Sequence, residues 1–355
     1  MSSELLDKTS QSSERLVSLW HSYGLKMVGL LALVLIVLVF GLTVGSYPVS
    51  WQQVVTALGR ELQNAPLNEH ELLIHDVIFA IRLPRVLAAV IVGMALATAG
   101  SAYQAIFRNP LVSPGILGVL SGAAFGATLG MLLHQSDLWI QVWAFGFGLV
   151  AVMVGLLIGQ MFGGASLIML ILGGMLSSAL FGAFLSIIKY LADPTDELPS
   201  ITYWLMGSLG MTSLSETLWL AIPIVISTLL LWMLGRALDI LSMGDQEALS
   251  LGVPVKTVRY VVIGLATLIS ALSVSIAGMI GWIGLLAPHI ARLVLGPMNT
   301  RLLPASTLLG AVFLVLADCV ARTAAQVEIP IGIVTECMGL PMFLLVLHRA
   351  KQGWN

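Results

Sequence analysis

Two arginines stand three residues apart in the stretch IRLPRVLAAV at 81–90, directly before a long apolar run. A guanidinium at the centre of a bilayer costs roughly 2.5–3.5 kcal/mol on insertion scales. Arg82 and Arg85 are therefore expected at a surface, where their planar, forked donors can hold a carboxylate in a fixed orientation. The alternative is that both side chains anchor the chain by reaching to the membrane interface.

A second polar stretch, RALDILSMGDQEALSLGVPVKT at 236–257, is the longest connection between apolar runs on its side of the predicted bundle. Gly252 and Pro254 are turn residues, and they are expected to divide this connection into two short amphipathic pieces. The residues alone fit a solvated loop and a docking element for a partner protein equally well.

The stretch FRNPLVSPGILG at 107–118 cannot form a continuous helix, because Pro110 and Pro114 interrupt it. Asn109 and Ser113 can hydrogen-bond the backbone groups that are released. Irregular backbone at membrane depth is tolerated only against protein or a water-filled cavity. The stretch is therefore either a plain turn or the mouth of a pathway.

Enzyme and metal motifs are missing from the sequence. It contains no GxxxxGK[ST], HExxH or GxSxG pattern, and His289 has no second histidine or carboxylate at ligand spacing. Neither catalytic residues nor a metal site are expected, and His289 is interpreted as structural. Cys319 and Cys337 lie in apolar runs and are expected to pack as small hydrophobic residues.

The elements that must position these residues are apolar helices. The 355 residues are 58% hydrophobic and 10% charged, whereas a soluble domain is about 25% charged. The fold class is therefore an all-α integral membrane protein. Ten apolar segments are expected, at about 27–46, 84–106, 115–133, 139–162, 167–190, 217–235, 258–279, 281–294, 303–321 and 331–348. The eighth is too short to cross about 30 Å of hydrocarbon unless it is buried within the bundle.

Small residues and basic residues add two further expectations. Glycines recur every four residues in GVLSGAAFGATLG at 118–130, which places them on one helical face for close packing, a substrate groove being the alternative. If the N-terminus is cytoplasmic, eleven of the 16 lysines and arginines fall on the inner side. In that orientation Arg82 and Arg85 face outward and the connection at 236–257 faces the cytoplasm.

Six stretches together resemble the FecCD family of iron-chelate and vitamin B12 permeases, which are type II ABC importers. These stretches are RLPRVLAAVIVGMALATAGSAYQAIFRNPLVSPGILGVLSGAAFG, YWLMGSLG, ALSLGVPVKTVR, IAGMIGWIGLLAPHIARLVLG, LLPASTLLGAVFLVLADCVAR and EIPIGIVTECMGLPMFLL. The resemblance covers about residues 27–350. It implies about ten transmembrane helices per subunit and a pathway between two permease subunits, either identical or paralogous.

The resemblance also implies roles for three groups of residues. Outer-surface arginines would receive glutamates of a periplasmic binding protein, and they are Arg82, Arg85 and Arg322. A cytoplasmic gate would be formed by Asn109, Leu111, Ser166 and Leu167. The ATPase coupling element would include Leu251, Gly252, Val253 and Pro254.

The function implied by the resemblance is that of a permease subunit, not an enzyme, in the bacterial inner membrane. It would move a ferric siderophore or related metal chelate from periplasm to cytoplasm. Haem, cobalamin and molybdate are alternative cargoes, and an ion-coupled secondary carrier is the alternative class. The expected partners are two copies of an ABC ATPase, a periplasmic binding protein, a second permease subunit and membrane lipid, but no nucleic acid. No cofactor is expected on this chain, because ATP would bind the ATPase.

The resemblance divides the chain into a cytoplasmic tail at 1–26, a permease domain at 27–350 and a cytoplasmic end at 351–355. One departure stands out within the permease domain. The last apolar run reads IVTECMGLP, with Glu336 and Cys337 where the family usually has small or apolar residues. A carboxylate there needs a partner or water. Glu336 therefore either makes an internal hydrogen bond or reflects a particular cargo.

Overall fold

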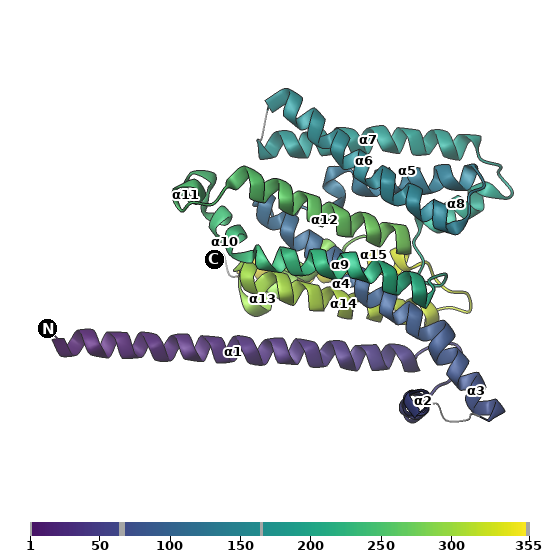
Figure 1. The fold of residues 1–355 in the computed structure, drawn as a ribbon, viewed down its shortest axis with the longest axis horizontal. Coiled ribbons are helices and arrows are strands. Elements are labelled where there is room, and N and C mark those ends of the chain that lie inside the picture. The colour runs from purple at the N-terminus through teal and green to yellow at the C-terminus, as the bar shows by residue number, and fades with distance from the viewer. Residues whose placement is uncertain (1, 64–67, 164–165, 353–355) are drawn as a thin grey trace.

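The computed structural model describes residues 2–63, 68–163 and 166–352, and every regular element within these ranges is a helix. Figure 1 shows the long helices side by side along the longest axis of the molecule. The expectation of an all-α membrane protein is confirmed.

The elements fall into long helices, short helices and two irregular turns. The long helices are α1 Ser2–Thr43, α4 Leu83–Phe107, α6 Asp137–Gly163, α7 Leu167–Leu191, α9 Leu214–Met233, α12 Val255–Ala277, α14 Asn299–Thr323 and α15 Ile331–Gln352. The short helices are α2 Trp51–Gln63, α3 Glu69–Asp76, α5 Val119–Leu132, α8 Glu197–Leu205, α10 Gly235–Met243, α11 Asp245–Ser250 and α13 Ile283–Leu295. A π-helical turn, η1 Val77–Arg82, precedes α4, and a 3-10 turn, η2 Pro114–Leu117, precedes α5.

The ten predicted apolar segments reappear in order as helices. Seven described helices are long and apolar enough to cross a membrane, and α5, α13 and the part of α15 at Ile331–Leu345 are shorter apolar helices. The eighth predicted segment is α13, which packs against α4 and α14 and buries Leu286, Ala287 and Ala291. Its short length is therefore accommodated inside the bundle, as expected.

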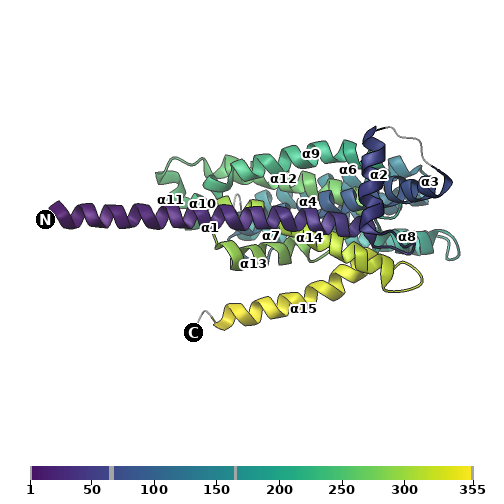
Figure 2. The same ribbon diagram turned by 90° about the horizontal axis from the view of Figure 1, so that it is seen from below.

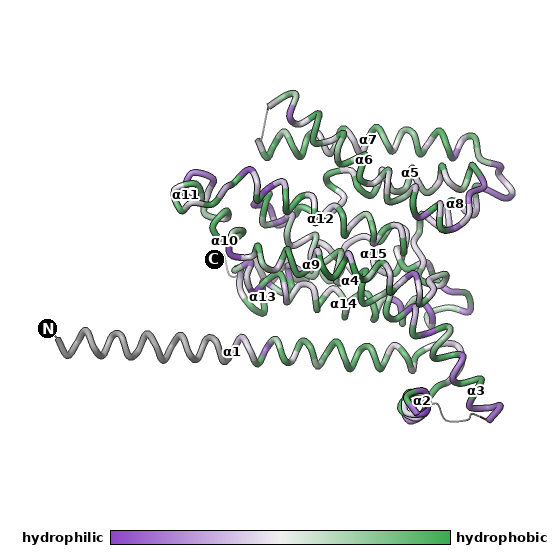
Figure 3. The backbone as a smooth tube through the Cα atoms, viewed as in Figure 1, coloured by the Kyte–Doolittle hydropathy of each residue, from purple (hydrophilic) through white to green (hydrophobic). Residues whose placement is uncertain are grey.

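The bundle has two distinct ends, which we name the α11 end and the α3 end (Figure 1). α1 begins and α15 finishes toward the α11 end, and Figure 2 shows the same arrangement from below. Cations gather there: Lys26 Nζ donates to the carbonyl oxygen of Val294 over 2.9 Å, and the Arg301 guanidinium lies 5.3 Å from the ring centre of Tyr23. Hydrophobic residues cover the long helices, and hydrophilic residues concentrate at the two ends (Figure 3).

Glycine allows the helices to approach each other closely. A β-carbon at Gly122 or Gly126 would overlap backbone carbonyl oxygens of α6, and the same holds for Gly93 and Gly310 where α4 crosses α14. The glycine strip at 118–130 therefore serves helix packing, which was the preferred interpretation.

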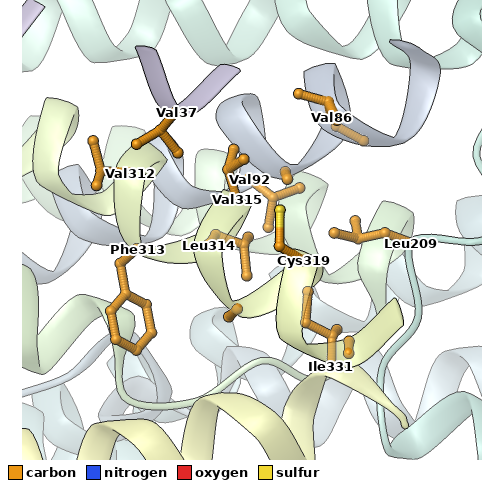
Figure 4. Packing of buried hydrophobic residues seen from close by; sticks show 14 of the residues in the cluster. Val37, Val86, Val92, Leu209, Val312, Phe313, Leu314, Val315, Cys319 and Ile331 are labelled. Atoms are coloured by element: carbon orange, nitrogen blue, oxygen red, sulfur yellow. The ribbon is translucent and has the colours of Figure 1, made fainter. Parts of the chain in front are cut away.

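The largest hydrophobic cluster joins α1, α4 and α14 near the α3 end. Figure 4 shows Val86 and Val92 of α4 beside Leu314 and Cys319 of α14. Cys319 is buried and packs as a small hydrophobic residue, as expected, whereas Cys337 is exposed on α15. The packing expectation is therefore not met for Cys337, whose side chain is exposed among the described residues.

α1 runs without a break from Ser2 and so includes both the polar segment 2–26 and the first apolar segment. The assignment of residues 1–26 to a cytoplasmic tail stays a prediction. One boundary differs from that expected from the sequence. The connection at 236–257 does form two short helices, α10 and α11, but they are divided at Gly244 and not at Gly252 and Pro254. Gly244 has φ 139° and ψ 158°, a conformation open only to glycine.

Candidate functional site

Both short helices of the 236–257 connection are fixed to the bundle by carboxylates. The Asp239 side chain on α10 accepts hydrogen bonds from the backbone N–H groups of Asn299 and Thr300, the second over 3.2 Å. These two residues begin α14, whose N-terminal N–H groups have no partners within the helix and attract negative charge. Asp239 therefore holds α10 against the start of α14.

Asp245, the first residue of α11, bridges two other helices. Its carboxylate accepts hydrogen bonds from Arg259 Nη2 on α12 at 2.9 and 3.0 Å, and from Arg108 Nη2 at 3.3 Å. Arg108 caps the C-terminus of α4 in a left-handed conformation, with φ 49° and ψ 35°. Through this bridge α11 is tied both to α12 and to the turn that follows α4.

The turn after α11 presents the residues assigned to coupling. Leu251, Gly252 and Pro254 are exposed and Val253 is half-buried, with Leu249 exposed beside them. Gly252 has φ 79°, and apart from its chain neighbours no atom of a described residue lies within 4 Å of the position that its β-carbon would take. A shallow cavity of 340 Å³ adjoins the turn, and it is lined by Asp245, Leu249, Pro254, Val255, Lys256, Thr257 and Arg259. The exposed apolar tip fits a protein-docking surface.

The residues assigned to a gate lie on two turns. Between α4 and η2, Asn109 Oδ1 accepts a hydrogen bond from the Leu111 N–H over 3.0 Å, and Leu111 is 61% exposed. Ser166 precedes α7 and is exposed, and Leu167 begins that helix. Both turns lie toward the α11 end (Figure 1). The assignment to a gate stays a prediction.

The three arginines assigned to docking come together at the α3 end, but they are buried. Arg82 is 3% exposed, and Arg85 and Arg322 are each 7% exposed. Arg82 donates to the carbonyl oxygens of Leu42 and Thr43 at 2.7 and 2.8 Å, and to that of Tyr47. Its guanidinium therefore serves as a cap for the end of α1.

Arg85 and Arg322 share one buried carboxylate, that of Asp318 on α14. Arg85 Nε lies 2.7 Å from Asp318 Oδ1, and Arg322 Nε lies 3.0 Å from Oδ2. Arg85 Nη1 also donates to the half-exposed Glu328 over 2.7 and 2.9 Å. Arg322 donates to the carbonyl oxygens of Gly41 and Val44 at 3.1 and 2.9 Å. The guanidiniums thus face acceptors within the chain, and their docking role stays a prediction.

Two remaining residues singled out in the sequence have local explanations. His289 Nδ1 lies 2.7 Å from the carbonyl oxygen of Leu285, and its ring packs edge-on against Phe343. Across the described ranges no group of three histidine, cysteine or carboxylate side chains could hold a metal ion. Glu336 is exposed on α15 and makes no hydrogen bond or ion pair with a described residue. The expectation of an internal hydrogen bond at Glu336 is therefore wrong.

Sequence reasoning missed the partners of the arginines. Asp318 and Arg322 stand four residues apart on one helix, which is the spacing of a helical ion pair and could have suggested their contact. Glu328 lies outside any helix, so its contact with Arg85 had no comparable signal. Asp245 and Arg108 are 137 positions apart, so their spacing in the sequence could not have predicted this contact.

Comparisons with known proteins agree on one family. Residues 33–349 match the FecCD transport family. The chain is 40% identical over 337 residues to the molybdate import system permease protein MolB of Haemophilus influenzae, covering 94% of this chain and 98% of that protein. It is 37% identical over 302 residues to a permease described for an iron chelatin transport system of Helicobacter pylori, covering 85% and 90%. A solved structure described as an inward-facing, metal-chelate type ABC transporter superposes with a TM-score of 0.81 at 37% identity, covering 91% of this chain and 98% of that one.

Proposed function

The chain belongs to the FecCD transport family and is a permease subunit of a binding-protein-dependent ABC importer, and from this premise we propose that its cargo is a metal oxyanion or a metal chelate. Molybdate is the first candidate, because the molybdate permease of Haemophilus influenzae is 40% identical over almost its whole length. A ferric chelate, which the sequence favoured, is the second candidate, because the iron chelatin permease of Helicobacter pylori is 37% identical.

The cargo is tested by uptake into proteoliposomes that contain the complete importer, with its binding protein supplied outside. Radiolabelled molybdate and a radiolabelled ferric siderophore are offered separately and then in competition. Uptake of molybdate supports the first candidate, and uptake of the ferric siderophore alone supports the second. Uptake of neither, with ATPase activity still stimulated by the binding protein, contradicts both.

We further propose that the α11 end faces the cytoplasm and that the turn 251–254 receives one of the two ATPase subunits of the importer. A periplasmic binding protein would then dock at the α3 end, and a second permease subunit would complete the pathway. The ion pair between Asp245 and Arg108 supports this proposal most strongly, because it joins α11 to the residue next to Asn109. The Asp245 carboxylate would thus transmit a movement of α11 to the turn at Asn109, which is part of the proposed gate.

Asp245→Ala is expected to reduce ATP-driven uptake about tenfold, the size of a modest coupling free energy. The substitution removes the ion pairs to Arg259 and Arg108, so a movement of α11 is no longer passed to the turn after α4. Basal ATPase activity of the assembled complex should persist. Uptake and ATP hydrolysis are measured on the same proteoliposomes.

The matched control is Glu247→Gln, which removes a negative charge from the same helix but leaves the ion pairs of Asp245 with Arg108 and Arg259 intact. It should transport normally. Equal transport by the Asp245 and Glu247 variants would show that the bridge does not transmit the movement.

The proposed gate consists of the turns carrying Asn109, Leu111, Ser166 and Leu167. Leu111 is exposed and its turn is short and held by proline on both sides, so its side chain can close a narrow opening between two subunits. A cysteine at position 111 should then cross-link to its counterpart in the second permease in the closed state. Failure to cross-link in every nucleotide state would remove position 111 from the gate.

Docking of the binding protein is proposed to involve Arg85 first. Of the three arginines, Arg85 is the one that pairs with a half-exposed carboxylate, Glu328. An incoming glutamate of the binding protein could replace Glu328 without disturbing Asp318. Arg82 and Arg322 would then support the site by holding the end of α1 and the Asp318 side chain.

Glu328→Gln is expected to strengthen binding of the binding protein by about two- to fivefold, because a partly exposed ion pair is worth up to about 1 kcal/mol. The competing internal carboxylate is removed while the Arg85 ion pair with Asp318 is kept. Affinity is measured by surface plasmon resonance on the importer in nanodiscs at low and high salt. An unchanged or lower affinity would contradict exchange at Arg85.

A further inference from the structure

The helix α2 runs in a direction that no long helix shares. Figure 2 shows it at right angles to α1, and in Figure 1 it is seen end-on beside the end of α1. Residues 44–50 join α1 to α2, so α2 begins within about 25 Å of the last residue of α1. α2 therefore crosses the α3 end of the bundle close to the level where a candidate span ends.

One side of α2 is apolar and exposed. Trp51, Val55, Leu58 and Leu62 follow one another at steps of four, three and four residues, which places them on one helical face. Their exposed fractions are 64%, 58%, 37% and 85%. A continuous stripe of this kind gains free energy when it is removed from water.

The other sides of α2 pack against the bundle or face α3. Val54 and Ala57 are buried in the same hydrophobic cluster as residues of α1, so the helix is fixed to the bundle. The polar side faces a cavity of 420 Å³ against α3, lined by Ser50, Gln52, Gln53, Thr56, Ala57, Arg60, His70, Glu71, Ile74 and His75. Figure 3 shows hydrophobic and hydrophilic residues together on α2. The helix is held to the bundle on one side and is polar on a second, and its exposed large hydrophobic side chains lie along the stripe.

We propose that α2 lies in the plane of the membrane interface at the α3 end, with its stripe buried in lipid. An amphipathic helix in such a position sinks its apolar face about 5–10 Å into the boundary between headgroups and acyl chains. Trp51 and the half-exposed Tyr47 before it suit the headgroup level, where aromatic side chains with a polar tip concentrate. The polar side of α2 then faces water.

Lipid is favoured over a protein partner by the position of α1. Figure 1 places α1 below the other long helices, and Figure 2, seen from below, shows it in front of them; along this helix Leu31, Leu35 and Phe40 are exposed. Such a span needs lipid against its outer side. Because α2 follows α1 after seven residues, its stripe continues this lipid-facing surface. The function of α2 is to anchor the α3 end at a fixed depth.

The proposal is tested on the assembled importer in phospholipid nanodiscs with spin labels on single cysteines. The background carries Cys319→Ala and Cys337→Ser. Val55→Cys and Leu62→Cys place the label on the stripe, and the matched controls Gln52→Cys and Thr56→Cys place it on the polar side of the same helix. Power saturation then measures collision with oxygen, which concentrates in lipid, and with a water-soluble nickel chelate.

The ratio of oxygen to nickel accessibility should be at least about fivefold higher at positions 55 and 62 than at 52 and 56. Equal ratios would show that the stripe faces water and would overturn the proposal. Protection of positions 55 and 62 from both reagents would overturn it as well, because a protein would then cover the stripe. The measurement requires no transport, so its outcome is independent of the cargo and of the coupling mechanism.

Discussion

Gly252→Trp is expected to abolish ATP-driven uptake while the permease itself remains folded. A tryptophan at φ 79° costs roughly 1–2 kcal/mol locally, and its side chain would project into the open space where the proposed ATPase surface lies. Since no described residue beyond the chain neighbours of Gly252 lies within 4 Å of that β-carbon, the defect should fall on the complex. Co-purification of the ATPase and stimulated ATP hydrolysis measure the loss.

Gly252→Ala is the matched control. Alanine at φ 79° bears the same kind of backbone cost, but its methyl group adds little bulk to the proposed docking surface. The alanine variant should retain assembly and uptake. Uptake that survives in the tryptophan variant, or that is lost equally in both, would refute the docking role of the turn at 251–254.

Asp318→Ala is expected to destabilise the permease by about 3–5 kcal/mol, because it leaves two buried guanidiniums without their shared carboxylate. Asp318 is fully buried between Arg85 and Arg322, and both arginines come from helices of the largest hydrophobic cluster. The midpoint of thermal aggregation in detergent should fall by about 10 °C. Fluorescence-detected size exclusion after heating measures that midpoint.

Glu328→Ala serves as the comparison, since it removes a half-exposed partner of the same Arg85 guanidinium. Its midpoint should shift by no more than about 2 °C. Equal shifts for the two variants would show that the burial of Asp318 does not increase its contribution to thermal stability. A large effect at Asp318 also means that charge reversal at Arg85 or Arg322 would disturb folding before it reported on docking.

The helical segments of this chain could be predicted from sequence because each is a long apolar run bounded by polar residues. The helix α13 is too short to cross the membrane alone, and its length therefore predicts that it is buried inside the bundle. The glycine strip was interpreted correctly for a similar reason: four-residue spacing on a helix implies close contact whatever the partner helix is.

The surroundings of the charged residues could not be predicted in this way. Arg82 is buried because the backbone carbonyl groups of Leu42, Thr43 and Tyr47 accept its hydrogen bonds. Every residue has a carbonyl group, so the sequence does not show which of them meet a given arginine. Glu328 reaches Arg85 across 243 residues. The break between α10 and α11 occurs at Gly244, because the backbone there adopts a conformation that a side chain would forbid. Each of these features depends on tertiary contacts.

We propose that ATP hydrolysis on a partner protein drives this permease and that α11 receives the resulting movement. Cargo uptake into proteoliposomes that contain the permease with its ATPase and binding protein tests this proposal. We expect uptake that requires hydrolysable ATP and persists when an ionophore collapses the proton and sodium gradients. Uptake by the permease without its ATPase, lost when the ionophore is added, would refute ATP-driven transport and identify an ion-coupled carrier.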